Sequence, residues 1–398
     1  MGPKNSIILC EPQCWGFEHA SFNAALLQTV LFAYPGARVS FIAEKEHLAC
    51  VRERLREAAG HIDPAVIWIE RAIPARSLGG WKRLREEARW LYRLLEIAAG
   101  EGAQSLVLCS ITAKGLLALK GLLHTRRAPA APVIAVVHGI LSTIENDPVV
   151  FWKRIGHLRQ ALRLPHPRQL TYLALGGSIY ACLLEAMPRA ARHFRVLDPP
   201  YFMGGAENPI DFKGTVRFGY FGTGRVAEKG FDRFVRLAEE SQREYPGSEF
   251  IMVGFLLDNA GVEAAKCVAV RGLSRVPLSA QEYDARARSV TYSVGLANPD
   301  HYRLVANASF LDALCYLKPG IYVRNLYLEH YFKLMGDVGY LCDSYDEVRD
   351  VVSSVLQSFP EGRYRQQCEN IRRGRDLFEP RNLAAHLRAI IAEGEEAL

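Results

Sequence analysis

The sequence has no long hydrophobic run and none of the common signatures of metal-dependent or phosphate-loop enzymes. No stretch approaches the roughly 18–20 apolar residues of a membrane-spanning helix, and the apolar segment that follows Met1–Ser6 is too short for a signal-peptide core. HExxH, Walker A, GxSxG, EF-hand and DxD patterns are missing. We therefore expect a cytoplasmic protein with no metal site and no cofactor.

The cysteines do not form a recognisable framework either. There are nine of them, an odd number, and no CxxC pair occurs. Most lie in apolar segments such as SIILC and SLVLCS, where a free cysteine behaves as a small buried hydrophobe. This usage is typical of a reducing compartment and favours neither disulfides nor a zinc site.

The 398 residues are enough for about two domains. The charge is unevenly distributed between the two halves: residues 1–200 contain 25 Lys and Arg against 16 Asp and Glu, whereas residues 201–398 contain 24 against 27. The basic first half is either an ordinary solvated surface or a surface that meets an anionic lipid or acceptor.

Short apolar segments alternate with helical patterns along the first half of the chain. The segments are rich in Val, Ile and Leu with little alternation, which is typical of buried parallel strands. The expected strands are Ser6–Cys10, Arg38–Ala43, Ala65–Ile69, Ser105–Cys109, Val133–His138 and Leu170–Leu175, with helices at Cys50–Ala59, Trp81–Ala98 and Pro148–Leu164. This order predicts a doubly wound α/β domain.

Proline and glycine then interrupt the pattern, and we expect an inter-domain linker across residues 197–213. A second α/β series follows. Its expected strands are Thr215–Phe221, Glu249–Val253, Cys267–Val270, Ser289–Leu296, Gly320–Val323 and Gly339–Leu341. Its expected helices are Lys229–Glu244, Ser279–Arg288, Ala306–Leu317, Leu326–Leu334, Ser344–Phe359, Gly362–Phe378 and Pro380–Glu396. Open parallel sheets bind ligands at the carboxyl ends of their strands, so two such domains facing across a cleft can hold two substrates.

The segment FGYFGTGRVAEKGFD, residues 218–232, is the most informative part of the sequence. A strand is expected to end at Phe221, followed by a turn containing Gly222, Thr223 and Gly224 and then by a helix. Glycines let a backbone approach phosphate closely, and the start of a helix offers free N–H groups. Arg225 and Lys229 add charges that can bind a diphosphate. The alternative is an ordinary turn with two solvated cations.

This segment resembles the first strand, loop and helix of the C-terminal domain in GT-B glycosyltransferases, particularly the retaining enzymes of family 4. The resemblance implies that Gly222, Thr223, Gly224, Arg225 and Lys229 bind the donor, although the loop here is about one residue longer. It also implies catalytic roles for Arg225 and Lys229, which would neutralise the departing nucleoside diphosphate.

A second segment, residues 297–320, resembles the family's loop and helix that carry two glutamates. The second carboxylate, which grips the donor ribose, falls on Asp312, whereas the first falls on Leu304. Leucine cannot replace a carboxylate, so the resemblance leaves sugar contacts to Asn307, Ser309 or residues 300–303. Asp312 can equally be a helix residue with a local polar contact.

The N-terminal half contributes fewer motifs. His138 ends an apolar segment and resembles the histidine of the family's N-domain strand, which faces the donor sugar across the cleft. The resemblance implies a catalytic role for His138, although a lone histidine at a strand end can also be structural. The loop over residues 11–23 is expected on the acceptor side, with Glu18, His19 and Asn23 as candidate acceptor contacts. The simpler interpretation is that Ser21 or Asn23 caps a helix.

Two basic amphipathic stretches also carry aromatic residues, Trp81–Leu95 and Phe151–Arg159. They are either packed helices with a solvated cationic face or sites of peripheral contact with the inner face of an anionic membrane.

Taken with the resemblance, the sequence predicts the α/β GT-B architecture, with two Rossmann-like doubly wound domains facing across a cleft. We expect an acceptor domain over residues 1–200, a donor domain over 213–378, and a final helix over 379–398 that packs back on the first domain. The implied function is metal-independent, retaining transfer from a nucleotide-sugar donor to a saccharide or lipid-linked acceptor, in polysaccharide or glycoconjugate synthesis, with no nucleic-acid partner. The alternatives are an inactive relative that binds a nucleotide sugar or a partner protein, and a nucleotide-sugar epimerase.

Overall fold

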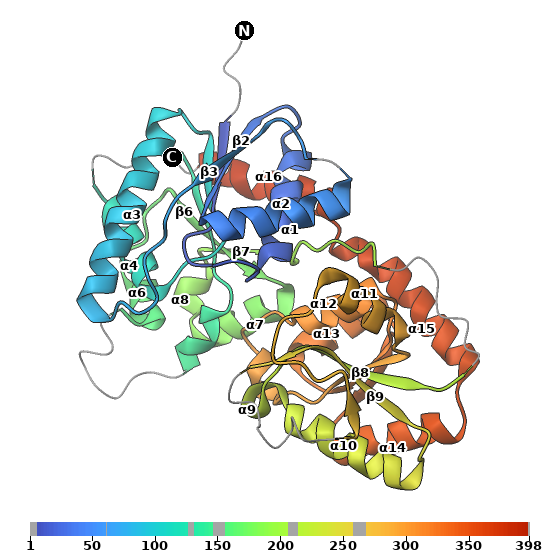
Figure 1. Ribbon diagram of the computed structural model, residues 1–398. Coiled ribbons are helices and arrows are strands. Elements are labelled where there is room, and N and C mark those ends of the chain that lie inside the picture. The colour runs from blue at the N-terminus through green and yellow to red at the C-terminus, as the bar shows by residue number, and fades with distance from the viewer. Residues whose placement is uncertain are drawn as a thin grey trace. The chain divides into compact units, whose positions relative to one another are not determined.

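The computed structural model describes residues 6–60, 62–125, 131–145, 156–205, 214–257 and 268–396. They divide into two compact units (Figure 1). The first comprises residues 1–202, 304–306 and 377–398, and the second comprises residues 203–303 and 307–376. Each unit is built around one parallel sheet with helices.

The first unit contains a seven-stranded parallel sheet in the order β3-β2-β1-β4-β5-β6-β7. The strands are β1 Ser6–Cys10, β2 Arg38–Ala43, β3 Val66–Glu70, β4 Ser105–Leu108, β5 Val133–Val136, β6 Leu170–Leu175 and β7 Phe194–Leu197. All residues of β1, β4 and β5 are buried, as the continuous apolar segments predict.

The helices of the first unit are α1 Ala20–Ala33, α2 Lys45–Ala59, α3 Gly80–Gly100, α4 Ala113–Leu123, the 3-10 helix η1 Ile140–Glu145, α6 Leu158–Arg163, α7 Gly177–Ala186, α8 Pro188–Ala191 and α16 Pro380–Glu396. The last helix, α16, lies beside α1 although the two are at opposite ends of the sequence (Figure 1). It contributes Leu383, Leu387, Ile390 and Ile391 to the core under β1 and β2.

The second unit contains a six-stranded parallel sheet in the order β10-β9-β8-β11-β12-β13. Its strands are β8 Arg217–Gly224, β9 Glu249–Leu256, β10 Val270–Arg271, β11 Tyr292–Gly295, β12 Gly320–Val323 and β13 Gly339–Cys342. Its helices are α9 Val226–Lys229, α10 Phe231–Glu244, α11 Ala280–Ser289, η3 Pro299–Tyr302, α12 Ala308–Cys315, α13 Leu326–Met335, α14 Tyr345–Gln357, α15 Glu361–Gly374 and η4 Arg375–Leu377.

Three expectations about individual elements are corrected. The strand expected over Cys267–Val270 is the two-residue β10, which begins at Val270, and Cys267 lies outside the described residues. Of the helix expected over Pro148–Leu164, the described part is helical only over Leu158–Arg163. The helix expected over Lys229–Glu244 is two helices, α9 and α10, separated at Gly230.

Gly230 explains that separation. Its φ of +63° lies in the left-handed region, which glycine adopts without steric cost. An added Cβ would also collide with the carbonyl oxygen of Leu296. The turn after α9 therefore packs directly on the backbone that follows β11, and this close approach requires glycine.

Candidate functional site

The glycine-rich segment after Phe221 is the end of strand β8, which corrects the expectation that it forms a loop. Gly222 and Gly224 remain paired with β9, at Gly254 and Leu256. Gly222 has a φ of +91°, and a Cβ there would lie 2.7 Å from Oγ of Ser309. The missing side chain therefore leaves the strand's carboxyl end open beside Ser309.

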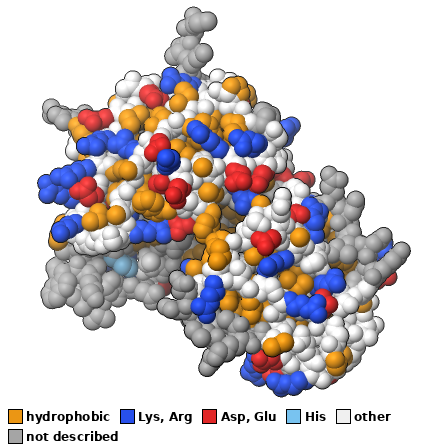
Figure 2. Space-filling view, viewed as in Figure 1, with side chains coloured by type: hydrophobic (Ala, Val, Ile, Leu, Met, Phe, Trp, Pro, Cys, Tyr) orange, Lys and Arg blue, Asp and Glu red, His pale blue; other side chains and the backbone are white. Residues whose placement is uncertain are grey.

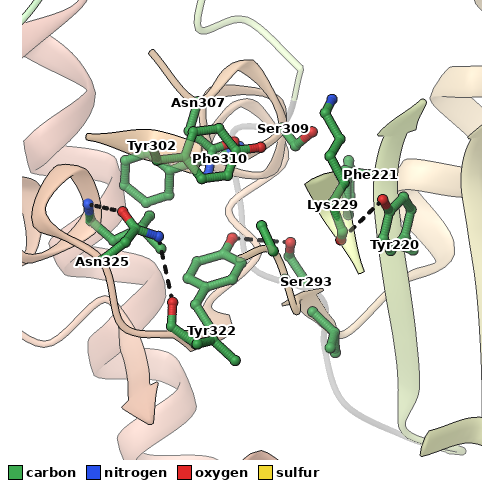
Figure 3. A pocket seen from close by; sticks show the side chains of 15 residues that line it. Tyr220, Phe221, Lys229, Ser293, Tyr302, Asn307, Ser309, Phe310, Tyr322 and Asn325 are labelled. Atoms are coloured by element: carbon green, nitrogen blue, oxygen red, sulfur yellow. Dashed lines mark hydrogen bonds between the residues drawn. The ribbon is translucent and has the colours of Figure 1, made fainter. Parts of the chain in front are cut away.

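Lys229 extends into this opening from the end of α9. Its ammonium group donates a hydrogen bond to Oγ1 of Thr223 at 3.4 Å, and Figure 3 shows its side chain on the same side of the pocket as Ser309. Burial lowers the pKa of Lys229 and Arg225 lowers it further, whereas Asp312 raises it. A bound anion would place negative charge beside this partly buried ammonium group and so stabilise its charged form.

Arg225 lies in a different environment. It ion-pairs with Glu228 at 2.7 Å, and the side chains of both residues are about half exposed, at 48% and 47%. The hydrogen bond from Arg225 is the main cause of a lowered pKa at Glu228. Exposed pairs of this kind contribute little to stability, so an incoming diphosphate can compete with Glu228 for the guanidinium.

The start of helix α12 forms another side of the opening. Asn307 caps the helix by accepting a hydrogen bond from the backbone N–H of Phe310 at 3.1 Å, and Ser309 lies in the first turn. The positive end of a helix dipole and its N–H groups favour anions. Lys229, Ser309 and this helix start together form a position suited to phosphate.

A pocket continues from Lys229 toward strands β11 and β12. Its empty space is about 410 Å³, open solvent at the mouth included. Aromatic side chains line much of it, and the hydroxyl of Tyr322 donates to Oγ of Ser293 at 3.0 Å (Figure 3). The residues that line it are Tyr220, Phe221, Lys229, Ser293, Val294, Gly295, Ala297, Tyr302, Asn307, Ser309, Phe310, Tyr322, Val323, Asn325 and Leu328. None of these described lining residues is a carboxylate, so the positive charge of Lys229 is unopposed within the pocket wall.

The sequence motifs identify only part of this lining. Ser293, Tyr302, Tyr322 and Asn325 are scattered over β11, η3, β12 and the residue before α13, and no spacing connects them. Their common signal is that they lie on or just after strands at the carboxyl edge of the sheet.

Asp312 lies one helical turn after Ser309 and is half-buried. Its charge reaches Lys229, and together with burial it raises the pKa of the Tyr283 hydroxyl on α11. Asp312 is therefore placed near the phosphate position but already faces a neighbouring helix. Leu304, at the position of the family's first carboxylate, is buried with 1% of its surface exposed.

In the first unit, His138 follows β5. Its ring packs against His19, with ring centroids 4.6 Å apart, and against Phe22. Burial lowers the pKa of His138 to about 3, with a smaller effect of His19 in the same direction, and a hydrogen bond to the backbone of Cys109 opposes it. Nε2 of His138 has no partner among the described residues. Burial therefore keeps the imidazole neutral.

The three candidate acceptor residues have different environments. Glu18 pairs with Arg76, and its pKa is lowered. His19 precedes α1 with a left-handed φ of 52°, and burial lowers its pKa. Asn23 is completely buried and donates to Oε2 of Glu11 at 3.0 Å. The expectation that these residues contact an acceptor stays a prediction, and Asn23 also has a structural role.

Glu11 and His47 are the residues of this region that sequence reasoning missed. Glu11 is fully buried and accepts hydrogen bonds from the backbone of Gln13 and Cys14 and from the side chains of Asn23 and Ser110. His47 completes the network, with Nε2 2.8 Å from Nδ2 of Asn23 and Nδ1 2.8 Å from the Gly16 carbonyl. The Asn23 amide donates to Glu11, so the same nitrogen donates to His47, whose proton must then lie on Nδ1. Glu11 immediately follows β1, and this position at the carboxyl end of a strand is the sequence feature that could have identified it as a site residue.

Among the residues that the structure describes, no three His, Cys, Asp or Glu side chains gather in a way that could hold a metal ion. No helix of the described ranges is both long and apolar enough to cross a membrane.

No protein-family model matches the sequence, and no curated protein is detectably similar to it. Several solved structures share the fold. Anabaena HepE in complex with UDP and glucose aligns with a TM-score of 0.66 at 14% identity, over 99% of this chain and 100% of that chain. WaaG, a glycosyltransferase involved in lipopolysaccharide biosynthesis, aligns with a TM-score of 0.64 at 14% identity, over 97% and 99%. S. aureus TarM aligns with a TM-score of 0.62 at 8% identity, over 98% and 99%.

These likenesses extend over nearly the whole chain and establish the GT-B fold, as the sequence predicted. At 8–14% identity they establish the fold alone. Function has to be argued from the site.

Proposed function

We propose that the protein transfers a sugar from a nucleoside-diphosphate sugar to a saccharide or lipid-linked acceptor, with retention of configuration and without a metal ion. The observation that carries the proposal is the Lys229 ammonium beside Gly222, Ser309 and the start of α12, at the carboxyl end of a central strand. HepE structures that contain UDP or UDP-glucose share this fold, which supports the same class of donor.

In this proposal, the second unit holds the donor. Lys229 and the α12 N–H groups stabilise the charge that grows on the diphosphate as the sugar bond breaks, a role that fixed cations and dipoles perform well. Asp312 accepts hydrogen bonds from the ribose hydroxyls. In the first unit, His138 offers a neutral nitrogen to the sugar or phosphate, and the loop with Glu18 and His19 meets the acceptor. Retention of configuration rests on the family resemblance.

One observation favours an inactive relative that only binds nucleotide sugars. Leu304 is apolar and buried, where the family's first carboxylate is expected. Loss of that group removes a polar contact to the donor, and the pocket must replace it with neutral groups such as Asn307 or Asn325.

The proposal is tested with a panel of UDP-, GDP- and ADP-sugars. Thermal shift first identifies the donor that binds, and release of nucleoside diphosphate is then measured with and without saccharide and lipid-linked acceptors. Acceptor-dependent release supports transfer. Binding without release on any acceptor supports the inactive relative, and acceptor-independent conversion to an epimeric sugar supports an epimerase.

We expect activity to persist in EDTA. The positive charge that the departing diphosphate needs comes from Lys229 and Arg225 in the proposed mechanism. Initial rates are measured in excess EDTA and after adding back Mn²⁺ or Mg²⁺. A rate that collapses in EDTA and returns with either ion would contradict the metal-free mechanism.

We also expect weak, salt-sensitive binding to anionic vesicles through α3, in keeping with a protein at the inner face of a membrane. The side of α3 that faces the protein is packed, with Arg83 paired to Glu87 and the Trp90 indole donating a hydrogen bond to the Ala72 carbonyl. Its outer face exposes Trp81, at 71%, and Lys82, Arg85, Arg89 and Arg93. Figure 2 shows basic side chains gathered over the edge of the first unit where α3 lies. The second basic stretch, Phe151–Arg159, lies largely outside the described residues.

The measurement is co-sedimentation with phosphatidylglycerol and phosphatidylcholine vesicles over a salt series. Because screening acts over about 8–10 Å at moderate salt, binding through exposed cations should fall as salt rises. Equal binding to the anionic and the zwitterionic vesicles would rule out this electrostatic contact.

A further inference from the structure

The first unit contains a hollow at the amino-terminal ends of its strands, whereas the candidate acceptor residues lie at the carboxyl ends. Its empty space is about 1200 Å³, open solvent at the mouth included, and it is formed by the segment from the end of α6 to His166 and by the segment from Ala186 to His193. These segments precede strands β6 and β7, whereas Glu11 and His138 follow strands β1 and β5. In a parallel sheet these positions are at opposite edges, so the hollow is separate from the proposed acceptor region.

The polar lining of this hollow is entirely basic. Arg163, Arg189 and Arg192 are exposed, and His166 and His193 are half-buried. Among the described residues that line it there is no Asp or Glu. Arg163 and Arg189 form no ion pair or hydrogen bond with any side chain in the described ranges, so both guanidinium groups are available to a ligand.

The two histidines stack in this basic environment. Their ring centroids are 3.6 Å apart and their planes differ by 13°. His166 contacts the Leu170 carbonyl through Nε2, which must therefore carry its proton, and His193 accepts a hydrogen bond at Nε2 from Nε of Arg192 at 3.1 Å. Nδ1 of His166 is buried and lacks a partner among the described residues.

Every charged neighbour that acts on these rings is a cation. Burial lowers the pKa of His166 to about 3, and His193, Lys120 and Arg192 act in the same direction. Burial also lowers the pKa of His193, again reinforced by Arg192, Lys120 and Arg195. Lys120 is itself buried and donates to the carbonyls of Ala161 and Leu164. The hollow therefore carries positive potential, with no carboxylate among the described residues that line it.

The supporting backbone is fixed in place. Lys120 holds the end of α6 through those carbonyls, which keeps Arg163 at the rim. Helices α6 and α8 lie side by side (Figure 1), so Arg163 and Arg189 approach the same hollow from two helices. A preformed set of forked cations is suited to a phosphate group, which arginine binds through paired hydrogen bonds.

We propose that this hollow, which we call the α6–α8 groove, binds a phosphate group carried by a second ligand, distinct from the sugar donor. Arg163, Arg189 and Arg192 bind the phosphate oxygens, and the histidine pair forms the inner wall. The phosphate comes either from a soluble phosphorylated compound or from the headgroup of an anionic lipid. The proposal does not depend on the glycosyltransferase assignment, because none of its residues belongs to the donor site.

The test measures pyrophosphate binding by isothermal titration calorimetry. All proteins carry Lys229→Ala and Arg225→Ala, so that neither donor-site cation contributes. The groove variant is Arg163→Gln/Arg189→Gln/Arg192→Gln, and the matched control is Lys82→Gln/Arg85→Gln/Arg93→Gln on α3. Both remove three exposed cations from the same unit, so a general charge effect is the same in both.

We expect the groove variant to bind pyrophosphate about 100-fold more weakly than the control, the loss that follows from removing several charge-assisted hydrogen bonds. Equal affinities in the two variants would overturn the proposal. Circular dichroism confirms that each variant folds, and Arg163→Lys/Arg189→Lys, which keeps the charge but not the forked geometry, should bind with intermediate affinity.

Two further arms identify the source of the phosphate, with glycerol phosphate as the soluble probe and phosphatidylglycerol vesicles as the lipid probe. In the vesicle arm the groove variant is compared with the parent protein that keeps all groove and α3 cations, because the α3 control removes cations from the surface expected to contact anionic vesicles. If the groove variant binds glycerol phosphate more weakly but binds the vesicles normally, the groove is assigned to a soluble compound. If the groove variant binds both probes more weakly, the groove is assigned to a lipid headgroup. A change with vesicles that leaves pyrophosphate and glycerol phosphate unaffected would reduce the groove to general surface charge and overturn the proposal.

Discussion

Replacing Lys229 by alanine should lower kcat and raise the donor KM, with a loss of about 2–4 kcal/mol in transition-state stabilisation. Lys229 reaches the open end of β8 next to Ser309, and its side-chain hydrogen-bond partner among the described residues, Thr223, is neutral and 3.4 Å away. Charge on the diphosphate is greater in the transition state than in the bound donor, so the cation acts more strongly there. Both kinetic constants should therefore change.

Arg225→Ala should have a smaller effect than Lys229→Ala. The Arg225 guanidinium is half exposed and must leave Glu228 before it can bind a phosphate. Because the two cations act on one diphosphate, the double variant should lose less than the sum of the single losses. Steady-state measurements of kcat and donor KM for the single and double variants test both expectations.

The matched control is Lys333→Ala, which removes an exposed lysine of the same unit from helix α13. It should leave kcat and the donor KM unchanged. If folded Lys229→Ala and Arg225→Ala also keep near-normal constants, the donor binds elsewhere and the proposed site has to be given up.

The sheets could be predicted from the sequence because burial imposes a continuous apolar pattern on parallel strands. Ser6–Cys10 and Arg38–Ala43 are strands with the expected bounds. The end of β8 could not be predicted in the same way. Gly222 and Gly224 have the composition of a turn, and they remain in the strand because β9 pairs with them, at Gly254 and Leu256.

That pairing depends on two glycines meeting across the sheet. A Cβ on Gly254 would collide with the carbonyl oxygen of Gly222. Nothing in the local pattern around Gly222 indicates a partner more than thirty positions away. The same reason applies to Gly230, whose contact with Leu296 divides the expected helix in two.

The candidate site shows a similar limit. Lys229, Asn307 and Ser309 were found because each follows a strand within a recognisable segment. The network around Glu11 was not, because its members come from β1, α1, α2 and the residue after Cys109. Single-sequence patterns describe local periodicity, and contacts between distant segments leave no such pattern.

Glu11→Ala should destabilise the first unit by about 2–4 kcal/mol, because its carboxylate accepts from several buried donors and alanine leaves them unsatisfied. Oε1 accepts from the backbone of Gln13 at 3.0 Å and of Cys14 at 3.1 Å, and also from Ser110, while Oε2 accepts from Asn23. These bonds hold the loop that leads to His19 and Asn23. The acceptor KM should therefore rise while donor affinity, which depends on the second unit, stays the same.

The chain offers a selective probe for this prediction. All five tryptophans lie within residues 1–152, so tryptophan fluorescence during urea unfolding reports on the first unit alone. Glu53→Ala is the matched control, since Glu53 is exposed on α2 and surface substitutions usually change stability by less than about 0.5 kcal/mol. Glu11→Gln keeps one acceptor oxygen but places an amide opposite other donors, so its urea midpoint should lie between those of the control and Glu11→Ala. If Glu11→Ala unfolds at the same urea concentration as Glu53→Ala, the buried carboxylate does not hold the loop, and a positioning role for Glu11 is ruled out.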